Sequence, residues 1–172
     1  LIASLFGLMN IFARTLGGLF GDRFGEKYGL NGRVRWLFAV VFCEGLALVL
    51  FSYTNTLILA IPALILFSLF VQMSEGATYA VVPFINKRAL GSVSGIVGAG
   101  GNVGAVAAGF LFKSEAITWP TAMFIMGICV TCASFFAFAV RFSPEAEGET
   151  QPAPEAALTP VLQPLGFAGA EA

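Results

Sequence analysis

Three ionisable side chains interrupt the long apolar blocks of this sequence: Arg14, Glu44 and Glu75. A charge at the centre of a bilayer costs about 2.5 to 3.5 kcal/mol on insertion scales. Each of these side chains is therefore expected to have an ion-pair partner or a functional role. Arg14 comes eight residues before Asp22, which is roughly 12 Å of helix and places it deep in its block. A guanidinium is planar, permanently charged and forked, and it suits a small planar oxyanion. We therefore expect Arg14 to bind an anion, with an ion pair to Glu44 or Glu75 as the alternative.

The two carboxylates are candidates for gating or coupling. Glu44, in FCEGLAL, is either a proton-linked group or the partner of a basic residue on another helix, and structural pairing is favoured. Glu75 lies nearer the end of its block, where it could close a gate by pairing with Arg23 or Lys87. The sequence does not separate coupling from gating.

A glycine-rich run, RALGSVSGIVGAGGNVGAVAAGFLF, covers residues 88–112. Gly98, Gly100 and Gly104 form a G-x-G-x-x-x-G pattern, but phosphate binding by such a pattern requires a preceding strand in a soluble sheet. Small residues four apart on a membrane helix instead allow two backbones to approach closely. Glycines also leave space for a ligand, and Asn102 adds one amide to this helix. Tight helix packing and a glycine-walled permeation path are both expected, and they are compatible.

The composition predicts an all-α membrane protein. Hydrophobic residues make up 58% of the chain and charged residues 11%, whereas soluble domains carry roughly a quarter charged residues. A helix needs about 20 apolar residues to cross the hydrocarbon layer, and five blocks have about this length. We expect transmembrane helices over residues 1–20, 36–53, 57–82, 90–112 and 118–140.

Basic residues set the expected orientation. They gather in the segment GDRFGEKYGLNGRVR, in NKR and at Arg141, and positively charged loops remain in the cytoplasm. The chain should therefore end inside the cell. Residues 143–172 are rich in proline, alanine and glutamate, which predicts a disordered cytoplasmic tail. The same placement of charge argues against nucleic-acid binding.

The sequence contains no pattern that is typical of a metal site or an enzyme active site. Cys129 and Cys132 form a single C-x-x-C pair in an apolar block, and the chain contains no histidine. Metal sites of this kind need a second ligand pair, so no metal or cofactor is expected. A nucleotide-dependent membrane enzyme would need a phosphate loop or an acid–base constellation, neither of which is evident.

The segment GLFGDRFG, residues 18–25, resembles the cytoplasmic G-x-x-x-D-R-x-G signature of the major facilitator superfamily. In that family the signature follows the second helix of each six-helix half. The resemblance implies that the five helices correspond to helices eight to twelve of a twelve-helix fold. It also implies that the N-terminal half is missing, and the opening LIASLFGLMN, without an initiator methionine or cleavage site, suggests an internal start.

Residues 11–142 resemble the nitrate/nitrite porter branch of that superfamily, most specifically in GAGGNVGAV. The resemblance implies a non-enzymatic transporter that moves nitrate, with nitrite as a further substrate, by alternating access for nitrate assimilation. It places Arg14 at the substrate-binding arginine of the eighth helix. The other implied substrate-binding residues are Gly98, Gly101, Asn102 and Gly104, and the implied gating or coupling residues are Asp22, Arg23, Glu44 and Glu75.

The resemblance further implies a multi-pass protein of the plasma membrane, and it leaves room for an accessory subunit. A second arginine for the substrate would lie in the N-terminal half. The nearest alternative is a major facilitator transporter of another small anion or an organic acid. A receptor or sensor built on the same helices is a more distant one.

Overall fold

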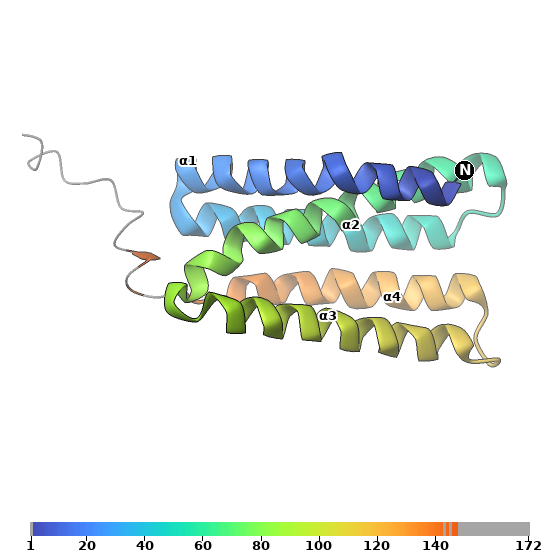
Figure 1. Ribbon diagram of the computed structural model, residues 1–172. Helices are drawn as coiled ribbons and strands as arrows, with labels where there is room; N and C mark the ends of the chain where they lie inside the picture. Colours follow the sequence, from blue (N-terminus) through green and yellow to red (C-terminus); the bar gives the residue numbers. More distant parts are fainter. Residues whose placement is uncertain (1, 143, 145, 148–172) are drawn as a thin grey trace, which may run out of the picture.

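The computed structural model describes residues 2–142, 144, 146 and 147, with side chains from residue 9 onward. The described part is all helical and contains no strand, as the composition predicted. Its elements are α1 (Ile2–Ser52), α2 (Leu57–Ile85), η1 (Lys87–Ala89), α3 (Leu90–Lys113), α4 (Trp119–Ser134) and η2 (Phe135–Ala139) (Figure 1). Apart from residues 144, 146 and 147, the segment expected to be a disordered tail lies outside the described residues.

Four of the helices are long and apolar enough to cross a membrane. They span Met9–Ser52, Leu57–Ile85, Lys87–Lys113 and Trp119–Ala139. The first reverses direction at Gly29, whose φ of 66° and ψ of −161° lie outside the helical region. A positive φ of this kind favours glycine. The reversal divides α1 into two arms, residues 2–28 and 30–52, that lie side by side (Figure 1).

The hairpin corrects one expectation. A loop was expected between residues 20 and 36, but the helix continues to the kink at Gly29 and resumes directly after it. Charged residues such as Arg, Lys and Glu are good helix formers, so a helix can extend beyond the apolar block on which the boundary was based. The loss of apolar character marked the end of the membrane-spanning part and not the end of the helix.

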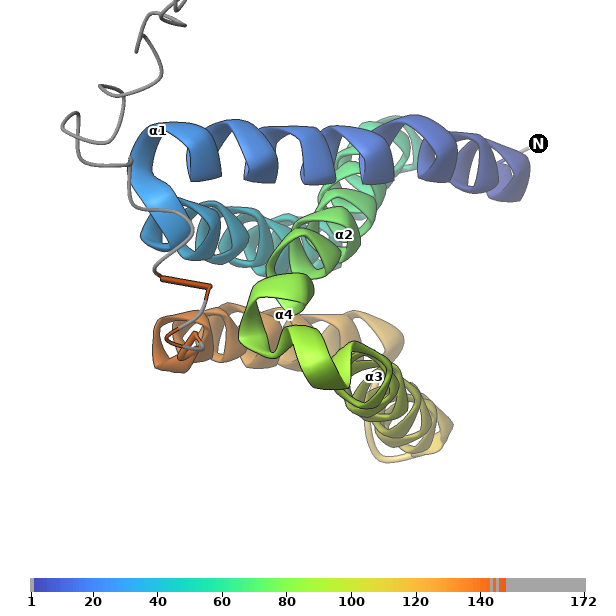
Figure 2. The same cartoon turned by 60° about the vertical axis from the view of Figure 1, so that its left-hand side comes forward.

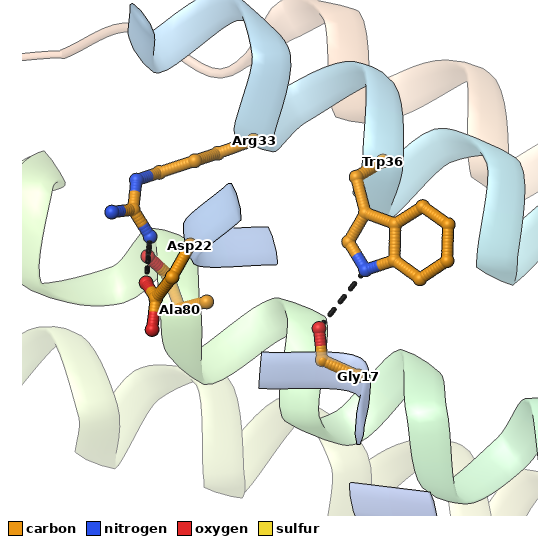
Figure 3. Close-up of polar contacts among 5 residues, drawn as sticks. All are labelled: Gly17, Asp22, Arg33, Trp36 and Ala80. Carbon is orange, nitrogen blue, oxygen red and sulfur yellow. Dashed lines mark hydrogen bonds and ion pairs between the residues drawn. The ribbon is translucent and has the colours of Figure 1, made fainter. Parts of the chain in front are cut away.

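Arg33 fastens the hairpin to α2. From the second arm it forms an ion pair with Asp22 of the first arm, and its Nη1 donates to the carbonyl of Ala80, 3.2 Å away (Figure 3). Its guanidinium also lies 4.5 Å from the ring centroid of Phe84. One turn along, the indole of Trp36 donates to the carbonyl oxygen of Gly17 at 2.9 Å.

Replacing Arg33 with alanine should therefore loosen the hairpin. The change removes one ion pair and leaves the Ala80 carbonyl without its side-chain donor. Hydrogen bonds to charged groups contribute about 1.5 to 3 kcal/mol, and we expect a loss of this order in the free energy of unfolding. Thermal unfolding of the detergent-solubilised protein measures it. Arg35→Ala, at an exposed position on the same arm, is the matched control, and an equal loss in both variants would contradict the assignment.

The tightest helix contacts use glycines outside the glycine-rich run. A Cβ added at Gly17 would approach the Met73 carbonyl carbon to 2.7 Å, and one at Gly76 would overlap the Arg14 carbonyl oxygen. Gly127 packs equally closely on the second arm, because its Cβ would lie 2.8 Å from the Val49 nitrogen. These approaches bring the first arm of α1 against α2 and its second arm against α4.

The glycines of α3 behave differently. No residue of α3 is buried, and a Cβ added at any of its seven glycines would meet nothing within 4 Å among the described residues. α3 lies at the edge of the bundle (Figure 2). Tight helix packing was one of the two roles expected for the glycine-rich run. The described part of the chain shows no such packing against α3. The physical reason is position, since an edge helix presents most of its surface outward.

Candidate functional site

Arg14 and Glu75 form an ion pair between the first arm of α1 and α2. Arg14 Nη1 lies 3.2 Å from Glu75 Oε2. The helices come this close because Gly76, next to Glu75, has no side chain between the two backbones. The guanidinium carbon also lies 5.5 Å from the ring centroid of Tyr79. The pairing of Arg14 with Glu75 is the alternative that the sequence left open for this arginine.

The pair is accessible. The side chain of Arg14 is 44% exposed and that of Glu75 is 48% exposed. Ion pairs between exposed side chains contribute about 0.2 to 1 kcal/mol, because water solvates the separated charges almost as well.

A pocket of about 430 Å³ lies beside this pair, between α2 and α3. It brings together three of the four substrate-binding residues expected on α3 and one gating or coupling residue expected on α2, Glu75. The lining residues are Ser74, Glu75, Thr78, Tyr79, Val97, Gly98, Gly101 and Asn102. Gly104, the fourth expected residue of α3, is exposed and does not line the pocket.

The polar groups of the pocket differ in what they can offer an anion. Thr78 and Ser74 donate their hydroxyl protons to backbone carbonyls of α2, at 2.8 and 2.9 Å. Their protons are therefore engaged within the helix. The amide of Asn102 and the hydroxyl of Tyr79 are potential donors. Arg14 is not among the lining residues, but its guanidinium N–H groups lie next to two of them, Glu75 and Tyr79. Gly98 and Gly101 widen the pocket because no side chain covers the helix there.

The other gating candidates lie elsewhere. Asp22 is paired with Arg33 in the hairpin, and the guanidinium carbon of Arg23 lies 6.0 Å from the Phe20 ring centroid. Neither lines the pocket. The sequence allowed Glu75 to pair with Arg14 or to close a gate with Arg23 or Lys87, and in the structure it pairs with Arg14. The close backbone approach at Gly76 explains the choice of partner.

Glu44 is half-buried on the second arm of α1. Its carboxylate faces the hydroxyl of Ser74, with the charge of Glu75 nearby. The expected structural pairing with a basic residue is not found for Glu44 in the part of the chain that the structure describes. The reason is the pairing above, since Glu75 and not Glu44 meets Arg14.

Sequence reasoning missed Tyr79 and the packing glycines Gly17 and Gly76. Tyr79 follows Glu75 by four residues, so helical periodicity places both on one face of α2. That spacing was a usable signal. The two glycines carried a weaker one, because nothing in the sequence says which helix each will meet.

Comparison with curated proteins finds nitrate transporters. The chain is 41% identical over 129 residues to high affinity nitrate transporter 2.5 of Arabidopsis thaliana, covering 74% of this chain and 26% of that protein. It is 38% identical over 123 residues to nitrate transporter 2.2 of Chlamydomonas reinhardtii, covering 69% of this chain and 23% of that protein. It is 31% identical over 159 residues to the nitrate/nitrite transporter NrtP of Nostoc punctiforme, covering 87% and 30%.

The chain thus spans roughly a quarter of the length of the curated relatives it matches. No protein-family model matches it, and no solved structure matches it.

Proposed function

Because the chain belongs to the nitrate/nitrite porter family, we propose that it forms part of a secondary transporter that carries nitrate, and also nitrite, across the plasma membrane. In this proposal the two arms of α1 each cross the bilayer, as do α2, α3 and α4 with η2. These five crossings correspond to helices eight to twelve of a major facilitator fold. The residues after Val140 face the cytoplasm, since basic residues gather on that side.

The observation that carries the proposal is the position of Arg14. Its guanidinium stands beside a pocket that contains Asn102, Gly98 and Gly101. Nitrate is planar and singly charged, and a forked guanidinium can bind two of its oxygens at once. Arg14 and Asn102 therefore act in this proposal as the substrate-binding groups, while Gly98 and Gly101 give the anion room. Gly104, outside the pocket, lies further along the same permeation path.

Transport follows from alternating access in this proposal. Rocking of two helical halves about a midplane site would expose Arg14 first to one side and then to the other. A second arginine from the remainder of the transporter completes the binding site, and an accessory subunit assists it. Asp22 and Arg23 contribute to gating or coupling away from the pocket, and Glu44 contributes next to Ser74, which lines it.

Nitrate uptake into vesicles tests the proposal, with Asn102→Ala and Asn102→Asp as the informative variants in the transporter that contains this chain. A neutral hydrogen bond contributes about 0.5 to 1.5 kcal/mol, so the alanine variant should raise KM for nitrate by about two- to tenfold. Aspartate keeps the shape but accepts hydrogen bonds only and adds a negative charge, so its effect should be larger.

Val103→Ala is the matched control, because Val103 is 70% exposed and lies outside the pocket. Uptake of phosphate or an organic acid in place of nitrate would favour the alternative substrate class. Absence of any anion uptake by the unmodified protein would overturn the proposed function.

A further inference from the structure

The pocket beside Arg14 contains a carboxylate, which is unfavourable in a site for an anion. Glu75 lines this pocket together with Asn102, and its Oε2 lies 3.2 Å from Arg14 Nη1. Nitrate and carboxylate both present planar oxygens to a guanidinium. Glu75 therefore occupies part of the same donor edge of Arg14 that a transported oxyanion needs.

We propose that Glu75 is an internal competitor that holds Arg14 when the pocket is empty and is displaced when the substrate binds. This inference rests on the proposed function. Two observations support displacement over permanent pairing: both side chains are nearly half exposed, and Glu75 itself faces the pocket. Tyr79 contacts the guanidinium independently, 5.5 Å from its ring centroid, so Arg14 keeps a fixed neighbour when Glu75 leaves.

Competition of this kind also sets specificity. An anion gains access only if it binds Arg14 better than Glu75 does. Nitrate can match the guanidinium with two oxygens, whereas chloride is a single sphere and cannot form two parallel hydrogen bonds. Specificity is a difference of affinities, and a built-in carboxylate raises the threshold for every anion that lacks the forked match. Glu75 is in this sense a specificity-determining residue.

The deciding variant is Glu75→Gln, measured in the transporter that contains this chain and reconstituted into vesicles. Glutamine keeps the size of the side chain but removes the competing charge. Exposed ion pairs are weak, so we expect KM for nitrate to fall by about two- to fivefold. We also expect chloride, a poor inhibitor of nitrate uptake by the unmodified protein, to inhibit the variant more strongly. A purely structural ion pair predicts the opposite, since its loss would disturb Arg14 and raise KM.

A second variant keeps the inference testable if the first one misfolds. Glu75→Asp retains the charge but withdraws it by one methylene, so KM should fall in the same direction by a smaller factor. Glu115→Gln removes a carboxylate beyond the end of α3, outside the pocket, and should leave KM unchanged. The inference is overturned if KM for nitrate is unchanged or raised in Glu75→Gln. If Glu75→Gln does not reach the membrane, the same result in Glu75→Asp overturns it. Failure of the unmodified protein to transport nitrate overturns the proposed function instead.

Discussion

Replacing Arg14 with lysine should lower kcat/KM for nitrate by about tenfold to a hundredfold, because lysine keeps the charge and loses the fork. One of two parallel hydrogen bonds to the anion disappears, and a hydrogen bond to a charged group contributes about 1.5 to 3 kcal/mol. Initial rates of nitrate uptake over a range of concentrations measure the change.

Lysine is an informative substitution because its ammonium can still pair with Glu75. The contact between the first arm of α1 and α2 also depends on the backbone of Arg14 and on Gly76, which the substitution leaves intact. A large loss of uptake with normal insertion would therefore reflect recognition of the anion and not a failure to fold. Arg35→Lys, at an exposed position of the second arm, should transport normally. Near-normal uptake by Arg14→Lys would show that Arg14 serves only its ion pair with Glu75.

The helical character of the chain could be predicted because hydrocarbon imposes it. Backbone groups in a bilayer must be satisfied within the segment, and blocks of about 20 apolar residues then have few structures open to them. The reversal at Gly29 was harder to place. Hydropathy identifies where the chain leaves the lipid, but Gly29 is one of three glycines between residues 25 and 32, and only one of them takes the positive φ.

The residues of the pocket could be predicted in part. Gly98, Gly101 and Asn102 were expected from the family resemblance of the glycine-rich run, and Glu75 was identified as a charge that needed a partner. The identity of that partner depended on which helices touch. Arg14 meets Glu75 only because Gly76 permits close approach of the two backbones. Such an approach depends on both helices, so the sequence of one helix does not predict it.

Within the described residues, the small-residue argument applies to helices other than α3. The densest glycine run makes no close contact within the described residues, while the scattered Gly17, Gly45, Gly76 and Gly127 hold the helices together. Density of glycine in the sequence thus indicated where space is left open. Close contact depended on a single glycine opposite the backbone of another helix.

Replacing Gly76 with valine should therefore be among the most damaging changes in the chain. Even the first carbon of the new side chain would overlap the Arg14 carbonyl oxygen and come within 2.9 Å of the Gly18 nitrogen. Both neighbours are backbone, so relief requires α1 and α2 to separate. Overpacking costs typically about 1 to 3 kcal/mol and occasionally more, and we expect about 3 kcal/mol or more here, together with loss of nitrate uptake. Thermal unfolding in detergent, followed by far-ultraviolet circular dichroism, measures the first effect.

Gly109→Ala provides the contrast, because a Cβ at Gly109 on α3 would meet nothing within 4 Å among the described residues. Alanine is a better helix former than glycine by about 0.8 to 1 kcal/mol, so this variant should be at least as stable as the unmodified protein. The two substitutions thus have opposite predicted signs, although both replace a glycine inside a membrane helix. Equal destabilisation by both would mean that glycine is needed for the helices themselves, and that the close backbone approach of Arg14 to Gly76 is not the cause of the loss.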